Sequence, residues 1–318
     1  NRYRKAKEQY QKLIPSIRKD NILKRRTPER LIAGLIAASI LAKCGCELRG
    51  VPGFFRIDGV WCFNLEPGML IPTRNAVGQI VALQVRRDKP SDWNDYCKRT
   101  GQNKEFLRYM TISAKGLPDG VTTDISQAHF PLGNDSLDDP ETAVCITEGP
   151  LKADAAVELK GNRKMFFIAL HGTSNTKTLP AIFAWLKGKG VETVFNVFDM
   201  DKVTNVNVAK AGKRVRAIAA GYGIKLAEKC WDAEYAQQKL SELNAICCEH
   251  GIFVPTTFNV FTDLANVSQE LAKRNIRHSR VKNADGLEEK HYWSDKTKGI
   301  DDYLLSIRTA TGGEGASA

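Results

Sequence analysis

Short apolar runs alternate with helix-like segments from Ala143 onward, and this alternation constrains the fold more than any other feature of the chain. The expected strands lie at 144–147, 165–170, 191–198 and 224–227, and the expected helices between them lie at 150–159, 179–187 and 206–220. Strands joined by helices of this length are typical of a parallel α/β sheet. We therefore predict an α/β fold for the second half of the chain.

The residues before this region follow a different pattern. Residues 54–88 hold short strand-like runs separated by turn signals such as Asp58-Gly59, and residues 106–113 form another such run. Turn residues between short apolar runs are typical of antiparallel strands. We therefore predict a smaller mixed α+β subdomain ahead of the parallel sheet.

The N-terminal residues are predicted to be helical. Thr27-Pro28-Glu29 is a typical helix start, and the apolar residues 31–42 follow it. About a dozen apolar residues are too few to cross a bilayer, so we expect a buried helix and no membrane partner. Residues 2–25 read as an amphipathic helix that is broken at Pro15.

Together these patterns predict four regions. They are a basic helical segment at 1–49, the subdomain at 50–139, the α/β domain at 140–306 with an insertion at about 231–298, and a flexible tail at 307–318. The chain starts with Asn1 rather than Met, and one interpretation is a fragment that lacks upstream segments.

Positive charge is concentrated at the N-terminal end. The chain has 47 Lys and Arg against 36 Asp and Glu, a formal net charge of +11, and residues 1–50 alone carry 13 basic and 4 acidic side chains. Such a segment attracts polyanions, of which nucleic acid is one. A solvated helix face is the alternative, and charge alone does not choose between the two.

The eight cysteines form no recognisable zinc-binding pattern. Cys44, Cys46 and Cys62 are close in sequence, but no fourth ligand is evident, so no zinc is predicted within this chain. Scattered cysteines in strand-like runs indicate a reduced, cytoplasmic protein.

Acidic residues lie where the predicted parallel strands end. Glu148 follows the first strand, Asp199 and Asp201 follow the third, and Asp301 and Asp302 come after the insertion. In an extended chain, residues two apart point to the same side, so Asp199 and Asp201 are expected to face one site. Clustered carboxylates repel one another unless cations bind, and Mg²⁺ prefers oxygen ligands. The alternative is that Glu148 caps a helix and the aspartates merely end a strand.

Four motifs together resemble a Toprim domain, the metal-binding catalytic fold of bacterial primases, topoisomerases and some nucleases. They are Ile146-Thr147-Glu148-Gly149 with Lys152, His171-Gly172-Thr173-Ser174, Phe198-Asp199-Met200-Asp201, and Gly299-Ile300-Asp301-Asp302-Tyr303-Leu304. The resemblance implies a Rossmann-like parallel sheet.

The region ahead of these motifs is similar to the corresponding subdomain of the DnaG-type primase core. The similarity rests on Leu70 to Arg74, Gly78 to Arg86 and Arg108 to Ser113, while Gly50 to Phe55 resembles primase-like proteins of plasmids, phages and other mobile elements. The chain departs from the family in showing no zinc-binding domain, in the spacing of Asp301-Asp302 and in the insertion.

The resemblance implies a DNA primase, a nucleotidyltransferase that makes primers from NTPs on single-stranded DNA during replication, with a replicative helicase as a possible partner. Glu148, Asp199, Asp201 and Asp301, with Asp302 as a further metal ligand, would hold two Mg²⁺ or Mn²⁺ ions for phosphoryl transfer. A metal-dependent Toprim nuclease and a non-catalytic nucleic-acid-binding module are the alternatives.

Basic residues are candidate contacts to the template or the nucleotide. They are Arg74, Arg86, Arg108, Lys115 and Lys152. Lys152 lies one turn after Glu148, where it could neutralise a phosphate. For each of these residues, an ordinary surface role is the alternative.

Overall fold

The computed structural model describes residues 1–64, 67–88, 108–123, 127–276, 280–282, 288–290 and 297–310. It divides into two compact units. Unit 1 comprises residues 1–74 and 79–125, and unit 2 comprises residues 75–78 and 126–318. Within the described ranges, no helix combines the length and the apolar character needed to cross a membrane.

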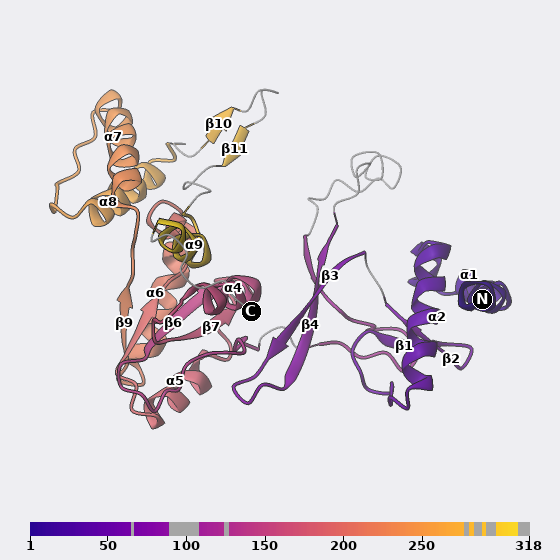
Figure 1. Cartoon of the computed structure of the whole chain (residues 1–318). Coiled ribbons are helices and arrows are strands. Elements are labelled where there is room, and N and C mark those ends of the chain that lie inside the picture. The colour runs from indigo at the N-terminus through magenta and orange to yellow at the C-terminus, as the bar shows by residue number, and fades with distance from the viewer. Residues whose placement is uncertain are drawn as a thin grey trace. The chain divides into compact units, whose positions relative to one another are not determined.

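Two long helices begin unit 1. Helix α1 spans Arg2–Lys19, the 3-10 helix η1 spans Leu23–Arg25, and helix α2 spans Pro28–Lys43 (Figure 1). The Thr27 hydroxyl caps α2 by accepting a hydrogen bond from the Arg30 amide at 3.4 Å, as the sequence indicates.

The predicted break at Pro15 is wrong, because α1 continues through this residue. Leu13 and Ile17, on either side of Pro15, are buried in one hydrophobic cluster with Leu31 and Leu35 of α2. Burial of this apolar stripe stabilises the helix enough to offset the backbone hydrogen bond that proline cannot make, a cost of about 3 kcal/mol.

The strands of unit 1 are antiparallel, as predicted, and they form two sheets. Strands β1 (Phe54–Ile57) and β2 (Val60–Phe63) form a hairpin, and β3 (Gly68–Arg74), β4 (Ile80–Arg87) and β5 (Tyr109–Thr111) form a three-stranded sheet. The Asp58-Gly59 turn of the hairpin is confirmed, with positive φ angles of 48° and 78°.

Unit 2 is built on a four-stranded parallel sheet, which confirms the predicted α/β fold class. Its strands are β6 (Ala143–Glu148), β7 (Met165–Leu170), β8 (Thr193–Asn196) and β9 (Lys225–Glu228), in the spatial order β7-β6-β8-β9. All three pairings are parallel, so the carboxyl ends of the strands share one edge. In open sheets of this kind, ligands bind beyond that edge.

Helices cover both faces of this sheet. Helices α5 (Leu179–Gly188) and α6 (Val206–Ala220) share a hydrophobic core with Val144, Ile146 and other residues of one face. Helix α4 (Pro150–Leu159) and helix α9 (Ile300–Ala310) share a second core with Cys145, Phe167 and other residues of the opposite face. The alternation of Val144, Cys145 and Ile146 between the two cores is what a strand buried on both sides requires.

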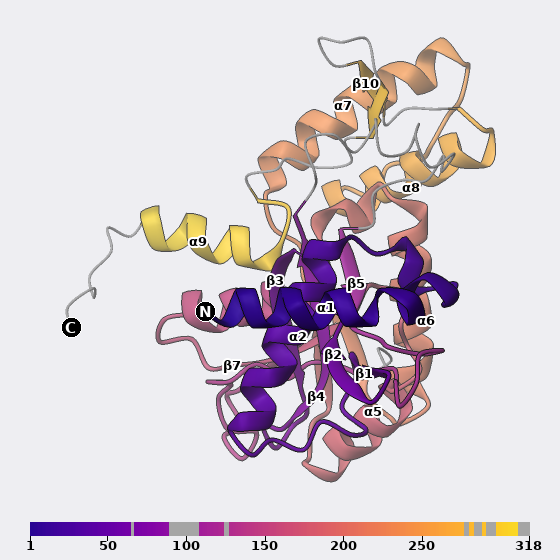
Figure 2. The ribbon, with the colours of Figure 1, turned by 90° about the vertical axis from the view of Figure 1, so that its right-hand side faces the viewer.

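The predicted insertion contains two packed helices. Helices α7 (Ala233–Glu249) and α8 (Val260–Lys273) lie side by side in both views of the ribbon and contribute Leu240, Leu243 and Leu264 to the second core (Figures 1 and 2). Two short strands, β10 (Arg280–Lys282) and β11 (Glu288–Lys290), pair after them.

The division of the chain differs from the predicted regions. The contact boundary falls at residues 125 and 126 rather than at 139, and the N-terminal helices belong to the same unit as the antiparallel strands. The reason is that α1 and α2 share a core with Phe55, Ile57 and Cys62 of the hairpin. Helix α9 extends to Ala310, so the first residues of the predicted tail are helical, and residues 311–318 lie outside the described ranges.

Candidate metal-binding acidic site

Glu148 lies at the carboxyl edge of the parallel sheet as the last residue of β6. Gly149 follows with a φ of 82°, a conformation that glycine adopts without strain, and its amide donates to the Leu170 carbonyl at 2.7 Å. This turn leads directly into α4, with Pro150 at its start. Lys152 is therefore held in the first turn of α4, on the same side as Glu148.

Asp199 and Asp201 do not lie in an extended strand, so that part of the prediction is wrong. Strand β8 ends at Asn196, and residues Met200–Val203 form the 3-10 helix η2 with Asp199 at its N-terminus. The side chain of Met200 is fully buried in the second core. The sharp turn that buries Met200 leaves both aspartates directed toward the same lysine, Lys298.

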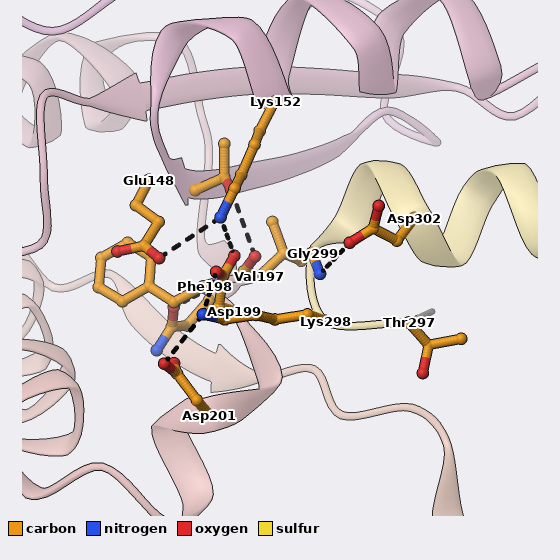
Figure 3. Close-up of polar contacts among 12 residues, drawn as sticks. Glu148, Lys152, Val197, Phe198, Asp199, Asp201, Thr297, Lys298, Gly299 and Asp302 are labelled. Carbon is orange, nitrogen blue, oxygen red and sulfur yellow. Dashed lines mark hydrogen bonds and ion pairs between the residues drawn. The ribbon is translucent and has the colours of Figure 1, made fainter. Parts of the chain in front are cut away.

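Two lysines lie between the carboxylates (Figure 3). The Lys152 ammonium contacts the carboxylate of Asp199 closely, and it lies 3.5 Å from Glu148 Oε1. The Lys298 ammonium lies 3.7 Å from Asp199 Oδ2 and 3.4 Å from Asp201 Oδ2. The structure thus brings Glu148, Asp199 and Asp201 together in one cluster with Lys152.

Lys298 is the site residue that the sequence analysis missed. Its only signal in the sequence is that it immediately precedes the Gly299-Ile300-Asp301-Asp302 motif. Its backbone is held in place, because its carbonyl accepts a hydrogen bond from the Met200 amide at 2.8 Å. The neighbouring Thr297 carbonyl accepts from the Trp231 indole at 2.6 Å.

Asp301 and Asp302 begin helix α9, and they have different surroundings. The Asp302 carboxylate accepts a hydrogen bond from the Gly299 amide at 2.9 Å, which caps the helix (Figure 3). Asp301 lies near enough to Lys152 to contribute to the raised pKa of that lysine. A Cβ atom at Gly299 would lie 2.2 Å from Asp301 Oδ1. The absence of a side chain at Gly299 therefore provides the space for the Asp301 carboxylate.

Burial raises the pKa of several carboxyl groups in the cluster. Loss of hydration, with a further contribution from the negative charge of Asp199, raises the pKa of Glu148 to about 7. Burial also raises the pKa of Asp201 and of Asp301. Burial alone would lower the pKa of Lys152, but Asp199 and Glu148 outweigh it and raise the pKa. For these three carboxyl groups, loss of hydration therefore outweighs the attraction of the neighbouring lysines.

The residues present fit a divalent cation in their chemistry. Carboxylate oxygens are the ligands that Mg²⁺ prefers, and Asp201 Oδ1 and Asp301 Oδ1 are buried without a hydrogen-bond partner. Among the described residues, no three acidic, histidine or cysteine side chains are arranged to hold a metal ion. The ammonium groups of Lys152 and Lys298 lie between the carboxylates instead.

The other predicted basic residues belong to unit 1. Arg86 pairs with Met69 and Tyr109 near one end of the three-stranded sheet, where the Arg108 carbonyl accepts from the Arg87 amide at 2.7 Å. Arg74 lies at the opposite end of β3, and Lys115 is exposed after β5. The sheet thus brings Arg86 and Arg108 to one end and separates Arg74 from them. Their role in nucleic-acid binding stays a prediction.

The described cysteines are free, and their environments differ. Cys44 and Cys46 are exposed just after α2, whereas Cys62 is buried in β2. Burial raises the pKa of Cys62 to about 12, so this thiol stays protonated at neutral pH.

Comparisons with known proteins give one structural likeness. No family model matches the chain, and no curated protein matches its sequence. A crystal structure of the Aquifex aeolicus primase, comprising zinc-binding and RNA polymerase domains, is similar with a TM-score of 0.41 and 12% sequence identity. The match covers 86% of this chain and 59% of that chain, so this chain spans less than two thirds of its length.

Proposed function

We propose that this chain is a primase-like nucleotidyltransferase of the Toprim type, which joins nucleotides on a single-stranded DNA template in a reaction that depends on Mg²⁺ or Mn²⁺. The observation that carries the proposal is the cluster of Glu148, Asp199 and Asp201 at the carboxyl edge of a parallel sheet, in which Asp201 Oδ1 is buried without a hydrogen-bond partner. Buried acidic groups with raised pKa values are typical of functional sites.

Each residue of the cluster has a role in this proposal. Glu148, Asp199, Asp201 and Asp301 would hold the divalent cation, which would activate the attacking 3′-hydroxyl and neutralise charge on the phosphates. Lys152 holds Glu148 and Asp199 together, and its ammonium could turn toward a phosphate of the incoming nucleotide. Asp302 caps α9 and so orients the adjacent Asp301.

The wider setting is part of the same proposal. Arg74, Arg86, Arg108 and Lys115 of unit 1 would contact the template backbone or the nucleotide. The motifs Gly50 to Phe55 resemble primase-like proteins of mobile elements, so we place the chain in the replication of such an element, in the cytoplasm, with a helicase as partner.

The test is a primer-synthesis assay with single-stranded DNA, labelled NTPs and Mn²⁺ or Mg²⁺. The decisive variant is Asp199→Asn, which keeps the shape of a side chain that is 4% exposed and removes its charge. Its matched control is Asp135→Asn, because Asp135 also pairs with a lysine, Lys160, but lies outside the cluster. We expect primer synthesis to fall at least 100-fold in Asp199→Asn and to stay near wild type in Asp135→Asn.

The same assay distinguishes the alternatives. Shortening of the DNA without incorporation of NTPs would replace the primase proposal with a nuclease that uses the same carboxylates. Binding of DNA without any chemistry, unchanged in Asp199→Asn, would leave only a nucleic-acid-binding module.

A further inference from the structure

The ammonium group of Lys298 forms ion pairs with both aspartates of the cluster, Asp199 and Asp201. Lys298 lies 3.7 Å from Asp199 Oδ2 and 3.4 Å from Asp201 Oδ2, so one ammonium bridges both side chains (Figure 3). Both aspartates are almost completely buried, with 2% and 6% exposed. Divalent cations such as Mg²⁺ are held in proteins by one or two carboxylates, so the ammonium lies where such a cation could be held.

The backbone at Lys298 is fixed by contacts at both ends of the insertion. Its carbonyl accepts from the Met200 amide, between the two aspartates in sequence, at 2.8 Å. On its N-terminal side, Thr297 binds Trp231 through its carbonyl and Asp232 through its hydroxyl. These residues mark the beginning of the insertion, so its two ends close on each other beside the acidic cluster. These contacts therefore hold the backbone of Lys298 beside Asp199 and Asp201.

Charge within the cluster limits how many ions it can take. A bound cation favours the ionised form of a carboxyl group. With Glu148, Asp199, Asp201 and Asp301 all ionised in this way, four carboxylates would balance two divalent cations if no lysine were present. Lys152 and Lys298 already supply two positive charges, which leaves two negative charges. One divalent cation neutralises that remainder, and the unpartnered oxygens of Asp201 and Asp301 remain available to it.

We propose that Lys298 takes the place of the second metal ion, so that this site binds a single divalent cation and uses the lysine ammonium as its other positive centre. The inference deepens the proposed function and rests on it. Lys298 bridges the aspartates through their Oδ2 atoms and stays there when the ion binds. Its charge then stands beside the phosphates in place of a second ion.

The test counts Mn²⁺ ions bound to the full chain by electron paramagnetic resonance and calorimetry, without nucleotide or DNA. The variant Lys298→Met removes the ammonium and keeps an unbranched side chain. The matched control is Lys164→Met, because Lys164 also bridges two carboxylates, those of Asp139 and Glu141, away from the site. We expect one ion in the wild type and in Lys164→Met, and two ions in Lys298→Met.

Other outcomes overturn the inference and can be told apart. Two ions in the wild type, with the same count in Lys298→Met, would mean that the lysine replaces no ion, while the proposed metal-dependent function would stand. One ion in both proteins would also overturn the inference. If neither protein binds an ion, and Asp199→Asn has no effect on primer synthesis, both the proposed function and the inference are wrong.

Discussion

At the scale of single residues, the acidic cluster combines groups that cost free energy to bury. Glu148, Asp201 and Asp301 have pKa values raised by burial, and the attraction of the lysines offsets only part of this rise. A protein keeps such an arrangement at the expense of stability, and sites of this kind are typically functional. Two residue-level consequences can be measured directly.

Stability should depend on pH through Glu148. Its pKa is about 7 in the folded chain against an ordinary value of 4.5, so the folded state holds a proton that the unfolded state has lost between these values. The free energy of unfolding should therefore fall as pH rises from about 4.5 to about 7, by on the order of 1–3 kcal/mol. Chemical denaturation in metal-free buffer at several pH values measures it.

The variant Glu148→Gln should lose most of this pH dependence, whereas Glu249→Gln, which changes an exposed carboxyl, should keep it. Saturating Mn²⁺ should also flatten the curve for the wild type, because a bound cation favours the ionised carboxylate. An identical pH dependence in Glu148→Gln would contradict the assigned cause.

Gly299 should matter for ion binding more than for folding. A Cβ atom there would lie 2.2 Å from Asp301 Oδ1, and the short carboxylate can turn away without disturbing the core. We expect Gly299→Ala to weaken Mn²⁺ binding about 10-fold and to change the melting temperature little. Calorimetry measures both. Gly188→Ala is the control, because a Cβ atom at Gly188 meets nothing within 4 Å.

At the scale of elements, the two ends of the insertion hold the site. Trp231 stacks on Tyr303 of α9 with ring centroids 5.4 Å apart, and its indole donates to Thr297 at 2.6 Å. One side chain thus joins the start of the insertion to the segment that carries Lys298 and to the helix that carries Asp301. The packed helices α7 and α8 between these ends belong to the same core.

Loss of the indole hydrogen bond should loosen this segment. Trp231→Phe keeps an aromatic ring against Tyr303 but leaves the Thr297 carbonyl without its donor, at a cost of about 1–2 kcal/mol. We expect faster amide hydrogen exchange at residues 297–303 and weaker Mn²⁺ binding. Trp185→Phe, in the core on the other face of the sheet, should destabilise the chain without changing exchange at 297–303. Equal exchange in both variants would show that Trp231 does not position Lys298.

At the scale of the whole molecule, each unit has its own hydrophobic core. The two clusters that enclose the parallel sheet contain residues of unit 2 alone, and the two clusters around α1, α2 and the hairpin contain residues of unit 1 alone. The complete acidic cluster with Lys152 and Lys298 lies within unit 2. Template-binding candidates such as Arg86 and Arg108 lie within unit 1.

Unit 2 should therefore fold and bind a cation without unit 1. We expect a protein of residues 126–318 to unfold cooperatively and to bind Mn²⁺ with an affinity within about threefold of that of the full chain. Calorimetry with Asp199→Asn as the negative control measures this. A fragment without a cooperative transition would show that unit 1 contributes to the core. The fragment should also lose binding of single-stranded DNA if unit 1 holds the template.

The sequence determined the local features on which the site depends. The helices at 150–159 and 206–220 and the strand at 165–170 match the structure at both ends, because propensity and hydrophobic periodicity act within a few residues. The placement of Glu148 at the end of a strand, and of Asp199 and Asp201 shortly after another, could be predicted for the same reason. Only the tertiary structure decided that α1 continues through Pro15, because packing of Leu13 and Ile17 supplies the stabilising free energy.

Tertiary structure also decided which residues share the site. The approach of Lys298 to Asp199 and Asp201, and the hydrogen bond from the Met200 amide to the Lys298 carbonyl, join segments about 100 residues apart in sequence. Local sequence patterns carry no information on such long-range contacts, which form only when burial of distant apolar residues outweighs the loss of chain entropy. That is why the positions of Glu148, Asp199 and Asp201 could be predicted from the sequence, whereas the position of Lys298 between the two aspartates could not.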